Sequence, residues 1–261
     1  MNQPVILMSF DVEEFDIPLE YGENMEMDEQ MRIGATGLDI TMNLVGRSGT
    51  PSTFFTTANF ASHFPNSIRS ISREHEIASH TYYHSRFVKE DLASSKAALE
   101  NITGREICGL RMPRMKAVTA SDVADAGYRY DSSINPTWIP GRYNNLKQPR
   151  TLHQEERIIR LPSSVTPNFR IPLFWLSFKN FPYSFYVKWV ERTLEKDGYV
   201  CLYFHPWEFA DLSHCRVPTY IKRHSGRQLQ HRFSQLLADL RQMGEFKRID
   251  EYLVSRSKVR I

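Results

Sequence analysis

The segment 4-PVILMSFDVEEFD-16 joins an apolar run directly to four acidic side chains. The apolar run predicts a strand over residues 4–12 that is buried on both faces, as strands of parallel sheets are. A single acid after such a strand would cap a helix or solubilise a loop. A cluster that includes Asp11, Glu13 and Glu14 instead indicates a functional site where the first strand ends.

The rest of the chain alternates predicted strands and helices. Strands are predicted over 50–59, 75–80, 107–113 and 199–205, and helices over 28–46, 65–74, 88–101, 119–126, 183–197 and 226–243. The intervening segment 132–185 is rich in Pro, Asn and aromatic residues and predicts long loops with short strands. Alternation of this kind is typical of a parallel α/β sheet or barrel. Because we find no linker or internal repeat, we predict one domain over residues 1–261.

Composition excludes several classes of protein. Lys and Arg number 33 against 30 Asp and Glu, and both signs are mixed along the chain, so no nucleic-acid-binding arm is expected. We interpret the basic end 254-VSRSKVRI-261 as a solvated tail. No apolar stretch is long enough to span a membrane. The start lacks a signal-peptide pattern, and the three cysteines lack disulfide or metal spacing, so we expect a reduced, cytoplasmic protein.

Two histidines four positions apart form the second group of interest, within 79-SHTYYHS-85. On a helical turn this spacing places the imidazoles of His80 and His84 on one side. Paired histidines at this spacing can bind a divalent metal such as zinc. A chance pair on the surface is the alternative interpretation.

Polar side chains follow four predicted strands. In a parallel barrel the carboxyl ends of the strands meet at one rim, where active sites form. Each residue alone could be a helix cap, a solvated loop residue or a core histidine, but their joint placement predicts a site. The residues are Asp11, Glu13, His80, His84, Arg111 in 109-GLRMPR-114, and His205 in 203-YFHPWEF-209.

This set of side chains suits metal-assisted hydrolysis of an amide. One carboxylate and two imidazoles can hold zinc with open coordination positions. A bound metal polarises a carbonyl group and lowers the pKa of water. A second carboxylate can remove the proton from that water, and another histidine can protonate the leaving nitrogen.

The same residues lie in motifs that resemble the polysaccharide deacetylases, the NodB-homology or carbohydrate esterase family 4 type, over most of the chain. The matching motifs, in order, are SFDVEE at 9–14, TFF at 53–55, HEIASHTYYH at 75–84, GLRMP at 109–113, YDSSINP at 130–136 and YFHPWEF at 203–209. The resemblance implies a distorted, incomplete (β/α) barrel.

The resemblance also implies a role for each matching residue. Many members have a second Asp where this chain has Val12; a subgroup spaces its acids as Asp-x-Asp, which makes Glu13 the third metal ligand. Glu14 and Asp16 are then expected to be solvated. The implied roles are Asp11 as general base, His80 and His84 as metal ligands, Arg111 as the residue that steadies the base, the Arg114 N–H as oxyanion donor, and His205 as general acid.

Two features of the predicted site have alternative interpretations. The family's Asp that orients the acid histidine has no evident match, and Glu208 and Asp131 are candidates. Aromatic side chains in the predicted rim loops could stack on sugar rings or could simply pack the loops. They are Trp138, Tyr143, Phe174, Trp175 and Trp207.

The resemblance and the residues together predict a metal-dependent hydrolase, with zinc as the metal, that removes acetyl from an N-acetylated sugar. A cytoplasmic location favours a precursor of surface polysaccharide as substrate. The alternatives are an amide hydrolase acting on a small non-sugar substrate, such as the metal-free relatives that open cyclic ureides, and a catalytically silent sugar-binding protein. The sequence does not indicate an oligomeric state.

Overall fold

The structure, a computed structural model, describes residues 3–256, so the last five residues of the basic end lie outside the described part of the chain. Its centre is one nine-stranded sheet, in which β8 runs antiparallel at one edge and β11 (Glu245–Lys247) pairs beside β1. The order across the sheet is β10 (Tyr199–Phe204), β1 (Val5–Val12), β2 (Thr53–Thr56), β3 (Glu76–Ser79), β4 (Gly109–Leu110), β5 (Tyr130–Asp131), β9 (Ile158–Arg160) and β8 (His153–Glu155).

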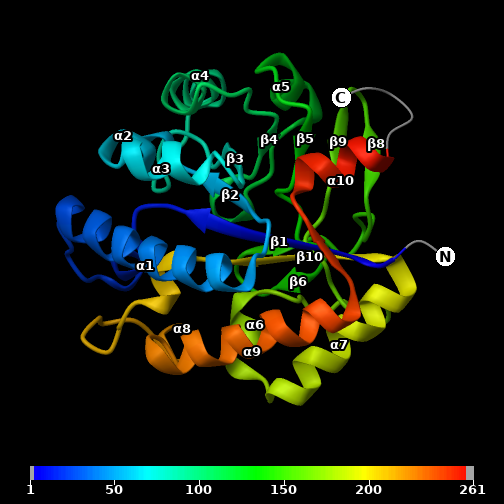
Figure 1. The fold of residues 1–261 in the computed structure, drawn as a ribbon. Helices are drawn as coiled ribbons and strands as arrows, with labels where there is room; N and C mark the ends of the chain where they lie inside the picture. The colour runs from blue at the N-terminus through cyan, green and yellow to red at the C-terminus, as the bar shows by residue number, and fades with distance from the viewer. Residues whose placement is uncertain (1–2, 257–261) are drawn as a thin grey trace.

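Helices surround this sheet, and a separate hairpin pairs β6 (Trp138–Ile139) with β7 (Tyr143–Asn144). In Figure 1, α2 to α5 lie above β1 and β10, and α6 to α9 lie below them. The helices are α1 (Met27–Ser48), α2 (Ala58–His63), α3 (Pro65–Ile71), α4 (Asp91–Thr103), α5 (Ala120–Asp125), α6 (Trp175–Asn180), α7 (Tyr183–Asp197), α8 (Thr219–Lys222), α9 (Arg227–Met243) and α10 (Ile249–Arg256), with short 3-10 turns η1 (Ile17–Tyr21), η2 (Pro113–Met115) and η3 (Pro206–Phe209).

The sheet curls into a barrel that is not closed by strand pairing. Among the described strands, no ladder joins β8 to β10. Ser164 crosses this gap: its N–H donates to the Cys201 carbonyl at 2.9 Å, and its hydroxyl accepts from the Cys201 N–H at 2.8 Å. The predicted fold class, a distorted and incomplete (β/α) barrel, is therefore confirmed.

Strand β1 is buried along its whole length, as the apolar run predicted. The even-numbered residues of β1 pack in the larger apolar cluster; they are Ile6, Met8, Phe10 and Val12. Val5 and Leu7 pack in a second cluster, together with residues of α10. Because side chains alternate along a strand, Ser9 and Asp11 continue the row of Val5 and Leu7. Asp11 is the last residue of this row, and it therefore lies at the carboxyl end of β1 and of the barrel.

Local capping explains where the predicted elements end differently. The strand predicted over 50–59 stops at Thr56, because the Thr57 hydroxyl accepts the Phe60 N–H at 3.2 Å and begins α2. Thr119 caps α5 in the same way, accepting from the Asp122 N–H at 3.1 Å.

Two glycines of α1 allow the helix to approach the site closely. Gly34 and Gly37 would be expected to weaken a helix, yet α1 runs unbroken through both. A Cβ atom at Gly37 would lie 2.2 Å from the Pro206 carbonyl oxygen, and one at Gly34 would lie 2.8 Å from the Glu13 carbonyl oxygen. These positions therefore hold α1 against the segments that carry Glu13 and the turn after His205.

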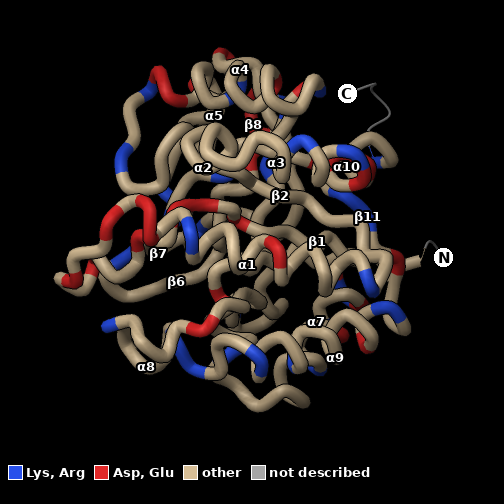
Figure 2. Tube along the Cα trace, turned by 60° about the vertical axis from the view of Figure 1, so that its left-hand side comes forward, with Lys and Arg blue, Asp and Glu red and all other residues tan. Residues whose placement is uncertain are grey.

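The charge distribution agrees with the mixed signs of the sequence. Lys and Arg are interspersed with Asp and Glu along the trace in Figure 2. No helix within residues 3–256 is both long enough and apolar enough to cross a bilayer. The three cysteines are free thiols.

Candidate active site

A cavity of about 250 Å³ opens at the carboxyl ends of the strands. Residues that follow or end β1, β3 and β10 line it, among them Asp11, Glu13, His80, His84 and His205. The structure thus brings together, in one cavity, side chains that the sequence placed on separate strand ends.

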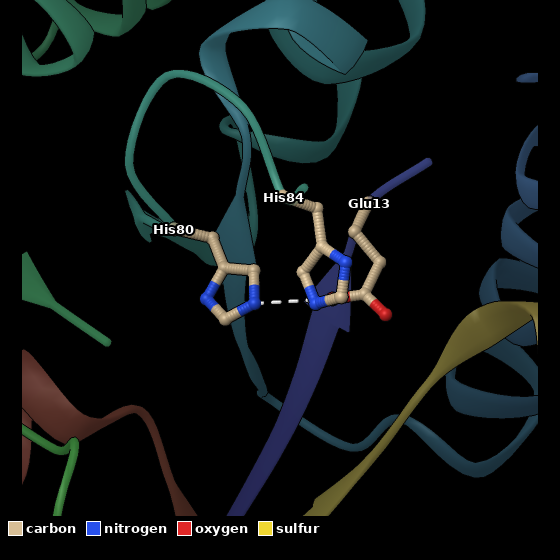
Figure 3. A group of neighbouring side chains, drawn as sticks. All are labelled: Glu13, His80 and His84. Atoms are coloured by element: carbon tan, nitrogen blue, oxygen red, sulfur yellow. Dashed lines mark hydrogen bonds and ion pairs between the residues drawn. The ribbon is translucent and has the colours of Figure 1, made fainter. Parts of the chain in front are cut away.

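Glu13, His80 and His84 converge on one point. The Nε2 atoms of His80 and His84 each lie 3.0 Å from Glu13 Oε2. The three possible ligand atoms all lie within 4.8 Å of one another, and all three residues are buried. Figure 3 shows the two imidazoles reaching toward the Glu13 carboxylate from the loop after β3.

The outer contacts of this group fix which ring nitrogens face inward. His80 Nδ1 lies 2.7 Å from the Arg111 carbonyl oxygen, and His84 Nδ1 lies 2.7 Å from Asp16 Oδ1. Metal-binding histidines commonly donate their other ring N–H to a carbonyl or carboxylate in this manner. The three side chains therefore fit a divalent metal such as zinc, because their donor atoms, spacing and outer contacts match such a site.

The two histidines do not share a helical turn, which corrects the prediction made from their spacing. Residues 80–88 belong to a loop, and Thr81 has a φ of 64°. A β-branched residue with positive φ is a backbone outlier, of the kind that clusters at functional sites. Through this loop the His80 and His84 rings lie with their centroids 5.6 Å apart.

Glu14 and Asp16 are buried, so the prediction that they are solvated is wrong. Glu14 accepts hydrogen bonds from Thr57 at 2.9 Å and from Asn59 at 2.5 Å at the start of α2. Asp16 contacts His84 and also accepts from Arg114 Nη2 at 2.9 Å. Both acids are thus bound by neighbouring side chains and do not line the cavity, whereas Asp11 and Glu13 do.

Opposing effects set the charges of the metal-free cluster. Burial favours a raised pKa for Glu13, but the imidazoles of His84 and His205 and a hydrogen bond with His80 hold that pKa well below its ordinary value. Burial favours a lowered pKa for His84, but Glu13 and Asp16 raise it from 6.5 to about 9. The folded, metal-free protein therefore holds His84 in its protonated form at neutral pH.

This charge state predicts how the stability of the metal-free protein depends on pH. A histidine whose pKa is raised by folding stabilises the protein fully below its unfolded pKa of 6.5, and this contribution is lost as pH rises through about 9. The free energy of unfolding should fall by up to roughly 3 kcal/mol across that range. Urea unfolding of chelator-treated protein at the two ends of the range measures it.

His84→Gln should remove most of this pH dependence. His214 is exposed and offers a matched control, so His214→Gln should leave the dependence as in the wild type. A metal-free protein that becomes more stable as pH rises through this range would contradict the assignment of charges.

Asp11 is held by Arg111, as the resemblance implied. Arg111 is fully buried; its Nη1 donates to Asp11 Oδ1 at 2.6 Å and to the Ser9 hydroxyl at 3.0 Å, and its Nη2 donates to the Ser132 hydroxyl at 3.0 Å. The second oxygen of Asp11 faces His205, with Oδ2 4.0 Å from Nε2. One carboxylate oxygen is thereby fixed and the other is directed toward the cavity.

His205 is oriented by Glu208, which the sequence left as one of two candidates. His205 Nδ1 lies 3.1 Å from Glu208 Oε1, so Nε2 faces the cavity. Glu208 is fully buried. Asp131 instead accepts a hydrogen bond from Arg160, with Nη1 2.6 Å from Asp131 Oδ2. Burial alone favours a lowered pKa for His205, but Glu13, Glu208 and Asp11 raise it, which favours the protonated form that a general acid needs.

The predicted substrate contacts are only partly brought together. Arg114 and Trp175 line the cavity, whereas Trp138 is 59% exposed and lies outside it. Trp207 is fully buried; its ring stacks on His205 at a centroid distance of 4.8 Å, and its Nε1 donates to Glu13 Oε1 at 3.1 Å. As a correction, we assign Trp207 to the support of Glu13 and His205, because no sugar can reach it.

Three tyrosines of the cavity wall were missed by the sequence analysis. Tyr21, Tyr203 and Tyr220 line the cavity, and the hydroxyl groups of Tyr21 and Tyr220 lie 3.0 Å apart. These two residues are 199 positions apart in the chain, so no local pattern could have paired them. Tyr203 is the first residue of the strand-end motif 203-YFHPWEF-209 and could have been included among its site residues.

Comparison with known proteins agrees with this fold. Residues 38–130 match the family model of polysaccharide deacetylase, and residues 132–254 match a domain of unknown function, DUF3473. Both segments contribute strands to the one sheet, since β2, β3 and β4 lie in the first segment and β8, β9, β10 and β11 lie in the second. No curated protein sequence matches the chain.

Solved structures show the same fold. A polysaccharide deacetylase-like structure from Mycobacterium smegmatis superposes with a TM-score of 0.65 at 18% identity, covering 100% of this chain and 94% of that one. One from Pseudomonas aeruginosa PAO1 gives a TM-score of 0.66 at 12% identity, with 98% and 92% covered. The Puue allantoinase gives 0.60 at 14% identity, with 98% and 91% covered.

These matches show the fold of the protein. The chain has the NodB-homology fold of carbohydrate esterase family 4, and its resemblance to the polysaccharide deacetylases is confirmed.

Proposed function

We propose that the protein is a metal-dependent hydrolase that removes the acetyl group from an N-acetylated sugar. The observation that carries this proposal is the convergence of Glu13, His80 and His84 beside Asp11 and His205 in one cavity. A ligand set beside a pair of proton-transfer groups, with Asp11 Oδ2 and His205 Nε2 4.0 Å apart, suits hydrolysis of an amide better than binding alone.

The residues divide the chemistry between them. A divalent metal held by Glu13, His80 and His84 would supply Lewis-acid activation of water and of the acetyl carbonyl. Asp11 takes the proton from the attacking water through Oδ2, while Arg111 keeps Oδ1 in place. This arrangement places a charged base, buried and already oriented, within reach of the reacting water.

His205 completes the reaction at the other side of the bond. Its Nε2 gives a proton to the sugar nitrogen as the bond to the acetyl carbon breaks, which releases an amine and acetate. The hydrogen bond from Nδ1 to Glu208 stabilises the charged ring before transfer and fixes its orientation. The backbone N–H at Arg114 remains the proposed donor to the developing oxyanion.

The cavity wall supports a sugar as the substrate. Aromatic rings of Tyr143, Phe174 and Trp175 present apolar faces, and the Arg114 guanidinium adds a polar anchor. Apolar walls with a few placed polar groups are typical of small-ligand sites. We include in the proposal a cytoplasmic location and a precursor of surface polysaccharide as the source of the sugar.

Acetate release tests the proposal. Protein reconstituted with zinc should release acetate from at least one of a panel of N-acetylglucosamine oligomers, nucleotide-linked N-acetyl sugars and N-acetylmuramyl sugars, and chelation should stop it. Release of product from allantoin alone would support the ureide hydrolase instead. Binding of a sugar without any acetate release would support the silent binding protein.

A further inference from the structure

Lys179, on α6, is a charged residue in a place where charge is costly. Its side chain is fully buried, at 0% exposure. Moving an ammonium group from water into a protein interior costs several kcal/mol unless partners compensate. Its Nζ lies 3.2 Å from Glu208 Oε2 and donates to the Ile221 carbonyl oxygen at 2.7 Å. The lysine is thus committed to one carboxylate and one backbone carbonyl.

That carboxylate is the one that orients His205. Glu208 Oε2 faces Lys179, while Glu208 Oε1 accepts the His205 backbone N–H at 2.7 Å and lies 3.1 Å from His205 Nδ1. The Lys179 ammonium also lies over the rings of Trp175 and Trp207, at 5.4 and 5.9 Å from their centroids. Those two rings contact the His205 imidazole edge-on and by stacking.

We propose that Lys179 is a positioning residue for the acid step, acting through Glu208 on His205. It does not line the cavity, and neither does Glu208, so it has no direct contact with a substrate there. The charge of Lys179 balances the buried Glu208 carboxylate. Lys179 is itself held by the Ile221 carbonyl, and its contact with Glu208 Oε2 leaves Oε1 directed at His205. The rate effects rest on the proposed function; the effect on the His205 ring does not.

Without this ammonium, the buried carboxylate loses its counter-charge. Glu208 then either binds a proton or turns toward another partner, and in both cases the contact to His205 Nδ1 weakens. His205 would still lie in the cavity, but its ring would be less well oriented and its protonated form less stabilised. The consequence should fall on departure of the amine, not on binding of the substrate.

Lys179→Met, which keeps the length and removes the charge, tests this. We expect kcat on the best N-acetyl sugar to fall about 10- to 100-fold, the usual cost of an outer partner, with KM unchanged and a smaller loss on 4-nitrophenyl acetate. Lys188→Met, an exposed lysine on α7, is the matched control and should keep the wild-type rate. The pair Lys179→Met with Glu208→Gln should be no slower than the slower single variant, because both act on one ring.

Nuclear magnetic resonance gives a readout that needs no turnover. The ¹⁵N signals of the His205 ring, assigned with His205→Ala, should shift in Lys179→Met and in Glu208→Gln but not in Lys188→Met. If Lys179→Met does not fold, the double variant removes both charges, should fold, and should show the same shift and rate loss. Unchanged His205 signals, or equal losses on amide and ester, would overturn the proposal. A wild-type protein without deacetylase activity that still shows these shifts would instead count against the proposed function alone.

Discussion

Replacing Asp11 with asparagine should lower the rate of deacetylation by about 100-fold or more, since a positioned general base contributes at least that much. The amide keeps the shape of the carboxylate, and its oxygen can still accept from Arg111. It cannot take a proton from water at neutral pH. Because Glu13, His80 and His84 are unchanged, metal content should remain near that of the wild type.

The structure adds a stability cost to this prediction. Arg111 is fully buried and its charge is balanced by Asp11, so Asp11→Asn should lower the free energy of unfolding by about 3 kcal/mol, as when one partner of a buried ion pair is removed. Hydrogen bonds to Ser9 and Ser132 remain, and rates should be compared where both proteins are folded. Ser132→Ala loosens Arg111 without removing the carboxylate and should retain most of the rate. An Asp11→Asn protein with nearly the wild-type rate would exclude Asp11 as the base.

Replacing His205 with alanine should separate amide from ester substrates. Removal of the acid should cost about 100-fold or more in kcat on an N-acetyl sugar, because the amine must be protonated to depart. The loss on 4-nitrophenyl acetate should be much smaller, since its leaving group departs without a proton. Metal content should not change, because His205 lies outside the Glu13, His80 and His84 set.

Two outcomes would reassign His205. If metal and both activities fall together, His205 acts as a further ligand. If the losses on amide and ester are equal while metal is retained, the ring packs against Trp207 and Trp175 without transferring a proton, and the acid must be sought at Glu208 or in water.

The fold was predictable because its strongest signals are local. The apolar run of β1 and the alternation of strands and helices depend on neighbouring residues, and the structure confirms them. What the sequence could not show was tertiary contact. Gly34 and Gly37 have low helix propensity, but the absence of a Cβ atom at Gly37 lets α1 pack closely against Pro206. This tertiary packing stabilises the helix despite the low propensity.

The residues that face the cavity could be predicted from the sequence, whereas the buried residues that contact and orient them could not. Strand ends and motif order indicated the residues that face the cavity, because parallel strands bring their carboxyl ends together. The supporting acids Glu14 and Asp16 have the same local sequence signal as solvated acids, and only their partners from other segments show that they are buried. Lys179 likewise lies in an ordinary helical segment, and nothing in 175-WLSFKN-180 indicates that its charge is enclosed.

The metal content of purified protein tests the central claim most directly. After reconstitution with zinc and removal of the excess, elemental analysis should find close to one zinc per wild-type chain. His80→Ala and His84→Ala should each lose it, because two remaining ligands hold zinc poorly. Glu13→Gln should bind weakly and Glu13→Asp should retain some metal. His63→Ala, an exposed histidine on α2, should bind as the wild type does. Undiminished zinc in His80→Ala or His84→Ala would contradict the assignment of this site.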